Sequence, residues 1–173
     1  AEFRAATDRL RLQLGQADRF GAGPVRSGRW KPYIRKVLED SRLPLELAAL
    51  PHVESSFDPT AYSKVGAAGM WQFMRSTGVR YMQVDQVIDE RRDPFLATHG
   101  AARLLADNYS VIQSWPLALT AYNHGLGGMR RAVAEQGTRD IGVMVAKHQS
   151  RSFGFASRNF YTAFHAAHDI DTN

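Results

Sequence analysis

The chain of 173 residues contains no cysteine. This absence excludes disulfide bonds, thiolate nucleophiles and cysteine-ligated zinc, but fits an oxidising compartment as well as a reducing one. The longest uncharged apolar run is far shorter than the ~18 residues of a membrane-spanning helix, so no such helix is expected. There is also no P-loop, dinucleotide fingerprint, Gly-x-Ser-x-Gly elbow or His-Glu-x-x-His motif. The commonest nucleotide, serine-hydrolase and zinc-protease sites are therefore excluded.

What is present indicates an ordinary globular domain. The 44% hydrophobic and 23% charged fractions are typical of folded proteins, and the length is that of one domain. Lysine plus arginine outnumber aspartate plus glutamate by 22 to 17, a net charge of +5. Such a surface favours polyanions such as nucleic acid, anionic lipid or an acidic cell-wall polymer, although a solvated basic surface explains the charge at least as well. No basic recognition helix with base-reading side chains occurs, so nucleic acid is not expected as a partner.

Apolar spacing predicts helices along almost the whole chain. Residues 2–20 place apolar side chains near one helical face, and the glycine-rich stretch 21–28 around Pro24 predicts a break. We therefore expect an N-terminal helical extension and linker over residues 1–28. The main domain is expected over residues 29–173.

Helix-start signals recur in the main domain. Pro32 and Pro116 stand where helix-starting prolines belong, and Asp93 before Pro94 is typical of an N-cap followed by proline at the first helical position. The alternation in residues 141–145 is too short to predict a strand. The expected fold class is all-α.

The first segment that could carry chemistry is residues 43–56. Leu47, Leu50 and Glu54 share one helical face, so an apolar stripe ends in a carboxyl group. Pro51 is expected late in this helix, where it would kink or end it near Glu54. A carboxyl group against aliphatic side chains resists ionisation and can serve as a general acid near neutral pH. A Glu that swings to solvent or pairs with an arginine is the alternative.

The second segment, residues 61–74, combines glycines with large side chains. Gly66 and Gly69 allow close backbone approach, and an amide stands among apolar residues. Carbohydrate sites need flat apolar surface for sugar faces and fixed polar groups for their edges. A core helix after a glycine turn is the alternative. The side chains in question are Trp71, Gln72, Phe73 and Met74.

The third segment ends an apolar helix. Tyr122 and Asn123 place a phenol and an amide directly before the Gly125 break. Each alone is more typical of a core or capping group than of a ligand-binding group.

In this order the three segments resemble the lytic transglycosylases of glycoside hydrolase family 23. The resemblance runs from about Trp30 to about Ala167 and implies an all-α, goose-type lysozyme-like domain with a substrate groove. It also implies cleavage of the MurNAc–GlcNAc β-1,4 bond of peptidoglycan without water, leaving 1,6-anhydro-MurNAc ends. The residues that carry it are Glu54-Ser55, Gly69-Met70-Trp71-Gln72 and Ala121-Tyr122-Asn123-His124-Gly125.

The resemblance assigns roles to individual residues. Glu54 becomes the single catalytic acid, and the family's phenol that hydrogen-bonds this acid falls on Tyr122. The groove is expected to include aromatic side chains as well, and whether Phe160 or Tyr161 faces it stays open. The substrate-binding residues implied are Ser63, Gln72, Met74, Tyr122 and Asn123, with Trp71 and Phe160 in the groove or its wall.

Three positions depart from the family's pattern. Met70 stands where leucine is usual, and His124 stands where a small residue is usual. Residues 157–160 read Ser-Arg-Asn-Phe where the family often has Thr-Arg-x-Tyr. An aromatic wall could therefore survive there without its hydroxyl.

The acids near Glu54 fit a reaction with one catalytic carboxyl group. Ordinary glycosidases use two, but Asp58 before Pro59 is typical of a turn and the acids of 85–93 of a helix start. A lone acid suits a reaction in which the substrate's N-acetyl group stabilises C1 and its C6 hydroxyl attacks. Hydrolytic muramidase and a catalytically idle peptidoglycan-binding module are the alternatives.

The remaining expectations concern partners and location. His165 and His168 with Asp169 lack a third ligand at motif spacing, so no metal or other cofactor is expected. The expected partner is the peptidoglycan glycan strand, with a monomeric chain and membrane anchoring only through segments outside it. Location in the periplasm follows from the substrate. The resemblance adds association with the outer membrane in the full-length protein, because the family often carries a lipoprotein signal.

Overall fold

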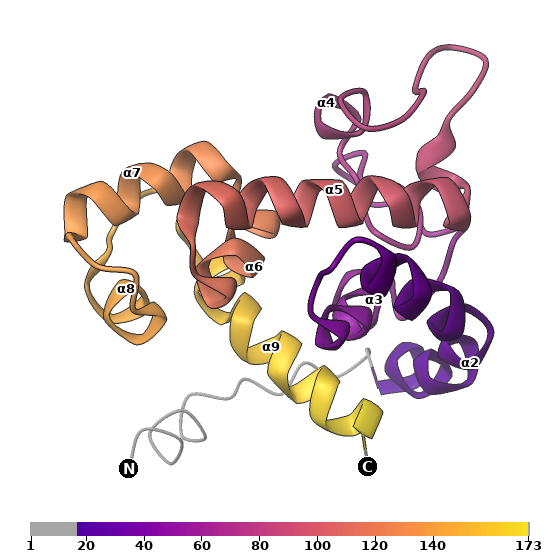
Figure 1. Ribbon diagram of the computed structural model, residues 1–173, viewed down its shortest axis with the longest axis horizontal. Coiled ribbons are helices and arrows are strands. Elements are labelled where there is room, and N and C mark those ends of the chain that lie inside the picture. Colours follow the sequence, from indigo (N-terminus) through magenta and orange to yellow (C-terminus); the bar gives the residue numbers. More distant parts are fainter. Residues whose placement is uncertain (1–16, 173) are drawn as a thin grey trace.

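The computed structural model describes residues 17–172, whose regular secondary structure is helical (Figure 1). Within this range the only strand-like pairings are isolated bridges, such as that between Tyr62 and Ala68. The all-α prediction is confirmed. The helices are α2 Ala17–Asp40, η1 Leu45–Ala49, α3 Leu50–Ser55, α4 Arg75–Gly78, η2 Glu90–Arg92, α5 Pro94–Ile112, α6 Trp115–His124, α7 Leu126–Gln136, α8 Ile141–Lys147 and α9 Phe155–Thr172.

The predicted break at residues 21–28 is wrong. Helix α2 runs through these glycines and through Pro24 and Pro32, so Pro32 lies inside a helix and does not begin one. Packing overrides local propensity here, because the helix buries an apolar stripe that includes Ile34 against η1, α3 and α5. Most of the helix expected over residues 2–20 lies outside the described residues.

One of these glycines permits close packing. A Cβ on Gly23 would lie 3.0 Å from Nδ1 of His52, so glycine lets α2 approach α3 closely. The sequence presents Gly23 as a breaker, whereas in the fold it is a contact residue.

Helix α5 is the central element. It starts as predicted, because the Asp93 carboxylate accepts hydrogen bonds from the backbone N–H groups of Phe95 and Leu96. It packs against α2 and α6, while α7 and α8 gather at the end of α5 away from α2 (Figure 1). The main core lies among α2, η1, α3, α5, α6 and α9, and a second cluster around Met129, Met144 and Phe153 supports α7 and α8.

Helix α9, the last described helix, is tied to α2, the first described helix. It packs against α6 and α3, and near its end Asp171 binds Lys31 of α2 at 2.7 Å and Nε2 of His52 at 2.9 Å. His52 is wholly buried and precedes Glu54 by two residues. The Asp171 carboxylate thus ties together three helices beside the candidate acid.

None of the helices in the described part of the chain is long and apolar enough to cross a membrane. This search covers residues 17–172.

Candidate active site

Glu54 lies in the last turn of α3. Pro51 occupies the first turn of this helix and not a late position as expected, because a 3-10 turn precedes it and the α-helix begins only at Leu50. The helix ends where Ser56 and Phe57 adopt left-handed backbone angles, with φ of 53° and 58°. Phe57 is fully buried and anchors that turn.

A cavity of about 920 Å³ opens beside Glu54. It brings together three of the predicted site residues, Glu54, Ser63 and Gln72. Helices α2 and α9 also contribute residues to its lining. Its lining consists of Ala22, Arg26, His52, Val53, Glu54, Ser55, Ser56, Asp58, Ala61, Tyr62, Ser63, Gln72 and Ala163.

Burial raises the pKa of the Glu54 carboxyl group to about 8. Protein atoms surround the carboxyl group although the residue keeps partial exposure, and desolvation penalises its charged form. Among residues 21–172 no group donates a hydrogen bond to it that would offset this penalty. Glu54 is therefore protonated at neutral pH, in agreement with the apolar stripe Leu47 and Leu50, both of which are buried.

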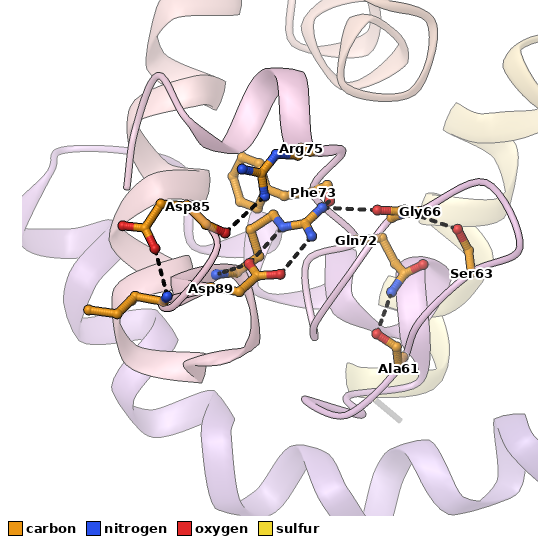
Figure 2. Close-up of polar contacts among 11 residues, drawn as sticks. Ala61, Ser63, Gly66, Gln72, Phe73, Arg75, Asp85 and Asp89 are labelled. Carbon is orange, nitrogen blue, oxygen red and sulfur yellow. Dashed lines mark hydrogen bonds and ion pairs between the residues drawn. The ribbon is translucent and has the colours of Figure 1, made fainter. Parts of the chain in front are cut away.

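Residues 61–74 form a tight loop rather than the alternative core helix. The Ser63 hydroxyl oxygen accepts the Ala67 N–H at 2.9 Å. The Gln72 backbone has a φ of 49°, and its side-chain amide donates to the Gly69 carbonyl at 2.8 Å and to that of Ala61 at 3.4 Å. Figure 2 shows this amide directed at Ala61, on the same side of the loop as Ser63. Both polar side chains are thus held in place at the cavity wall.

Arg91 holds this loop from behind. Its buried guanidinium donates to the carbonyls of Gly66 and Phe73 at 2.9 and 3.0 Å and pairs with Asp89 at 2.7 Å (Figure 2). Arg91 lowers the pKa of the Asp89 carboxyl group and keeps it ionised. The 85–93 acids were expected only as a helix-start cluster, and this supporting role gave no sequence signal.

The expected hydrogen bond from Tyr122 to Glu54 is not formed. The Tyr122 hydroxyl donates to the Trp71 carbonyl at 2.8 Å, which joins α6 to the residue before Gln72. Burial and the nearby Glu54 charge raise the pKa of the phenol well above its usual value. The phenol therefore lies near the acid but fixes the loop.

The remaining predicted residues lie away from the cavity. The Trp71 and Phe160 rings are 0% and 5% exposed and do not line the cavity, so their predicted place in the groove or its wall stays a prediction that only the wall could meet. Both rings are part of the main hydrophobic core. The Trp71 Nε1–H donates to the hydroxyl of Thr98 at 3.0 Å. Met74 is 42% exposed outside the cavity lining. Asn123 is exposed, and its amide oxygen accepts the Ser157 hydroxyl at 3.0 Å.

We expect Tyr122→Phe to lower the free energy of unfolding by about 1–3 kcal/mol, because the Trp71 carbonyl loses its partner. Turnover should fall, since the Gln72 loop loosens. The alkaline limit of activity should stay where it is, because burial alone sets the Glu54 pKa. Denaturant titration and a pH profile measure both. A displaced alkaline limit would show that the phenol bonds the acid.

Sequence reasoning missed several lining residues. Ala22 and Arg26 fell in the stretch expected to be a linker, and nothing local signals that α2 continues through it. Asp58 does form the expected turn, accepting from the N–H and hydroxyl of Thr60, but it also lines the cavity. Tyr62 is 65% exposed at the cavity and is the aromatic side chain on its lining.

Within the described range no group of three or more His, Asp or Glu side chains is placed to hold a metal ion. His165 contacts the Tyr161 hydroxyl at 2.8 Å, and Nδ1 of His168 lies 3.9 Å from Asp169. Tyr161 packs against the core. The two histidines make polar contacts with neighbouring side chains of α9.

Most of the residues that line the cavity lie in a region of the chain that matches a known protein family. Residues 32–145 match the family described as the transglycosylase SLT domain. This chain belongs to that family. The match includes Glu54, Ser63 and Gln72 but neither Arg26 nor Phe160.

Curated relatives agree with this membership. Membrane-bound lytic murein transglycosylase D of Escherichia coli (strain K12) is 32% identical over 142 residues, covering 73% of this chain and 31% of that protein. Membrane-bound lytic murein transglycosylase F of Maricaulis maris (strain MCS10) is 36% identical over 124 residues, covering 63% of this chain and 26% of that protein. The resemblance to lytic transglycosylases is confirmed, and the SLT chain spans less than a third of these relatives.

Proposed function

We propose that this SLT domain is a peptidoglycan lytic transglycosylase that cleaves the MurNAc–GlcNAc β-1,4 bond and leaves 1,6-anhydro-MurNAc ends. The observation that carries the proposal is the protonated Glu54, with a pKa of about 8, in a cavity that also presents Ser63 and Gln72. Family membership and the names of the relatives point to the same substrate. The glycan strand is then the partner and the periplasm the site of action.

The mechanism needs one acid and uses it twice. Glu54 donates its proton to the glycosidic oxygen as the C1–O bond breaks, while the N-acetyl oxygen of the substrate stabilises the electron-poor C1. The C6 hydroxyl of the same sugar then attacks C1, and the Glu54 carboxylate takes its proton. The C1–O6 bond closes the anhydro ring, Glu54 is protonated again, and no water is consumed.

The only other acid on the described cavity lining is Asp58. One of its oxygens accepts two hydrogen bonds from Thr60, at 2.8 and 2.7 Å, which commits the side chain to its turn. Glycosidases that hydrolyse use a second carboxylate as a base or nucleophile. The commitment of Asp58 therefore favours the non-hydrolytic route, with Ser63 and Gln72 as substrate-binding residues.

Incubation with purified sacculi separates the candidate functions. A lytic transglycosylase should clear turbidity and release 1,6-anhydro ends. A muramidase would clear it and release reducing ends, whereas an idle binding module would sediment with sacculi that stay turbid. Either of these two results would contradict the proposal.

Activity should depend on pH through Glu54. Because the acid form donates the proton, kcat/KM should be high below pH about 8 and fall by about tenfold per pH unit above it. Initial rates of sacculus clearing from neutral to alkaline pH measure this. An alkaline limit near the ordinary carboxyl range would show that Glu54 is ionised in the free protein and is not the acid.

A further inference from the structure

One charged side chain on the described cavity lining lies outside the family match, the guanidinium of Arg26 on α2. Arg26 lines the cavity together with Glu54, Ser63 and Gln72. Its Nε donates to the carbonyl of Ser56 at 2.8 Å, which fixes the side chain to the end of α3. Close packing of α2 on α3 at Gly23 brings it there.

Among residues 21–172 the two terminal nitrogens of the fixed guanidinium have no hydrogen-bond acceptor. Within this range only Nε donates a hydrogen bond, and Arg26 forms no ion pair with any carboxylate. Guanidinium is the side chain that best matches a planar carboxylate, through two parallel N–H···O bonds. A positive charge with open donors at a cavity wall is therefore suited to an anionic ligand group.

The charges around Arg26 keep this role separate from catalysis. Burial is the sole cause of the raised Glu54 pKa, so the Arg26 charge does not ionise the acid. Besides Glu54, Asp58 is the acid on the described lining, and its carboxylate would repel an anionic group. Arg26 is the only lysine or arginine among these lining residues. A carboxylate in the cavity would thus be directed towards Arg26.

We propose that Arg26 binds the carboxylate borne by the 3-O-lactyl arm of MurNAc. This inference rests on the proposed function. It adds a substrate contact made by a residue that lies outside the family match. The carboxylate has two sources: the lactyl group itself in peptide-free glycan, or the acidic stem peptide attached to it. GlcNAc oligomers have neither and should be indifferent to Arg26.

The test measures binding in the Glu54→Gln background, which prevents turnover. Three ligands are titrated: a neutral chitooligosaccharide, a peptide-free GlcNAc–MurNAc oligomer, and the same oligomer with stem peptides. Arg26→Gln is compared with Arg26→Lys, which keeps the charge but loses the planar fork. Arg35→Gln, an exposed arginine on the same helix away from the cavity, is the matched control.

Arg26→Gln should weaken binding of carboxylate-bearing ligands by roughly ten- to a hundredfold. Chitooligosaccharide binding should not change, Arg26→Lys should restore part of the affinity, and Arg35→Gln should match the parent. The lactyl carboxyl is free only in the peptide-free oligomer, because the stem peptide is attached to it through an amide bond. Weakening of only the peptide-free ligand therefore identifies the lactyl carboxylate, and weakening of only the peptide-bearing one identifies a carboxylate of the stem peptide. Weakening of both MurNAc ligands would show that Arg26 binds a carboxylate from either source.

Two results would overturn the inference. Equal weakening of all three ligands would mean that Arg26 only supports the Ser56 turn, and unchanged binding would mean that it contacts no ligand. In either case sacculus clearing by the wild-type chain would leave the proposed function standing. Failure of the parent to bind any glycan, together with turbid sacculi, would instead reject the proposed function itself.

Discussion

Glu54→Gln should lower the rate of sacculus clearing by about 10⁴-fold or more. General acid–base catalysis is typically worth ~10²–10⁴-fold, and here both proton transfers depend on one group. Glutamine preserves the shape of the side chain but cannot transfer a proton. Because the wild-type carboxyl group is already neutral, the substitution leaves the local charge unchanged at neutral pH. The variant should therefore fold normally and still bind glycan.

Two further substitutions sharpen this result. Glu46→Gln makes the same chemical change at an exposed position of η1 and should leave clearing unaffected. Asp58→Asn replaces the carboxylate oxygen that accepts from Thr60 with an amide oxygen that can also accept, and should retain most of the activity. Substantial clearing by Glu54→Gln would remove Glu54 from the mechanism. A loss in Asp58→Asn as large as that in Glu54→Gln would identify a second catalytic carboxylate.

Gly69→Ala should lower the free energy of unfolding by about 2–5 kcal/mol. Its φ of 78° lies in the left-handed region, where a side chain costs about 1–2 kcal/mol. A Cβ would also lie 1.8 Å from the Arg91 carbonyl oxygen, and relieving such overpacking costs about 1–3 kcal/mol more. Activity should fall with stability, because the Gln72 amide is anchored on the Gly69 carbonyl.

Gly66→Ala is the matched control. Gly66 has a similar φ of 86°, but its Cβ would meet nothing closer than the Tyr62 hydroxyl at 3.9 Å. It should therefore show only the backbone part of the cost. Equal losses for the two variants in urea denaturation would contradict a steric role of Arg91 at Gly69.

The parts of the fold that the sequence predicted well depend on local chemistry. Asp93 before Pro94 caps α5 because a carboxylate and a proline satisfy a helix start wherever they occur together. The helical nature of the chain and the raised pKa of Glu54 followed from apolar spacing. Gln72 and Ser63 were placed in the site by resemblance, and the structure puts both at the cavity.

The predictions that failed, or that stay open, concern features that are set by contacts between segments far apart in the sequence. Glycine and proline in residues 21–28 predict a break, yet contacts with α3 keep α2 helical through Pro24. The size of Trp71 and Phe160 suits a sugar platform or a core, and spacing cannot choose between them. The Tyr122 partner depends on where the Trp71 carbonyl lies, which only the folded loop determines.

The most direct test of the account is the chemistry of the new glycan ends. Sacculi are digested by the wild-type chain in water enriched in heavy oxygen, and the released fragments are weighed by mass spectrometry. Attack by the C6 hydroxyl predicts MurNAc ends lighter than a reducing end by one water and free of heavy oxygen. Reducing MurNAc ends that carry the heavy oxygen would show that water attacks C1, and would make this domain a hydrolytic muramidase.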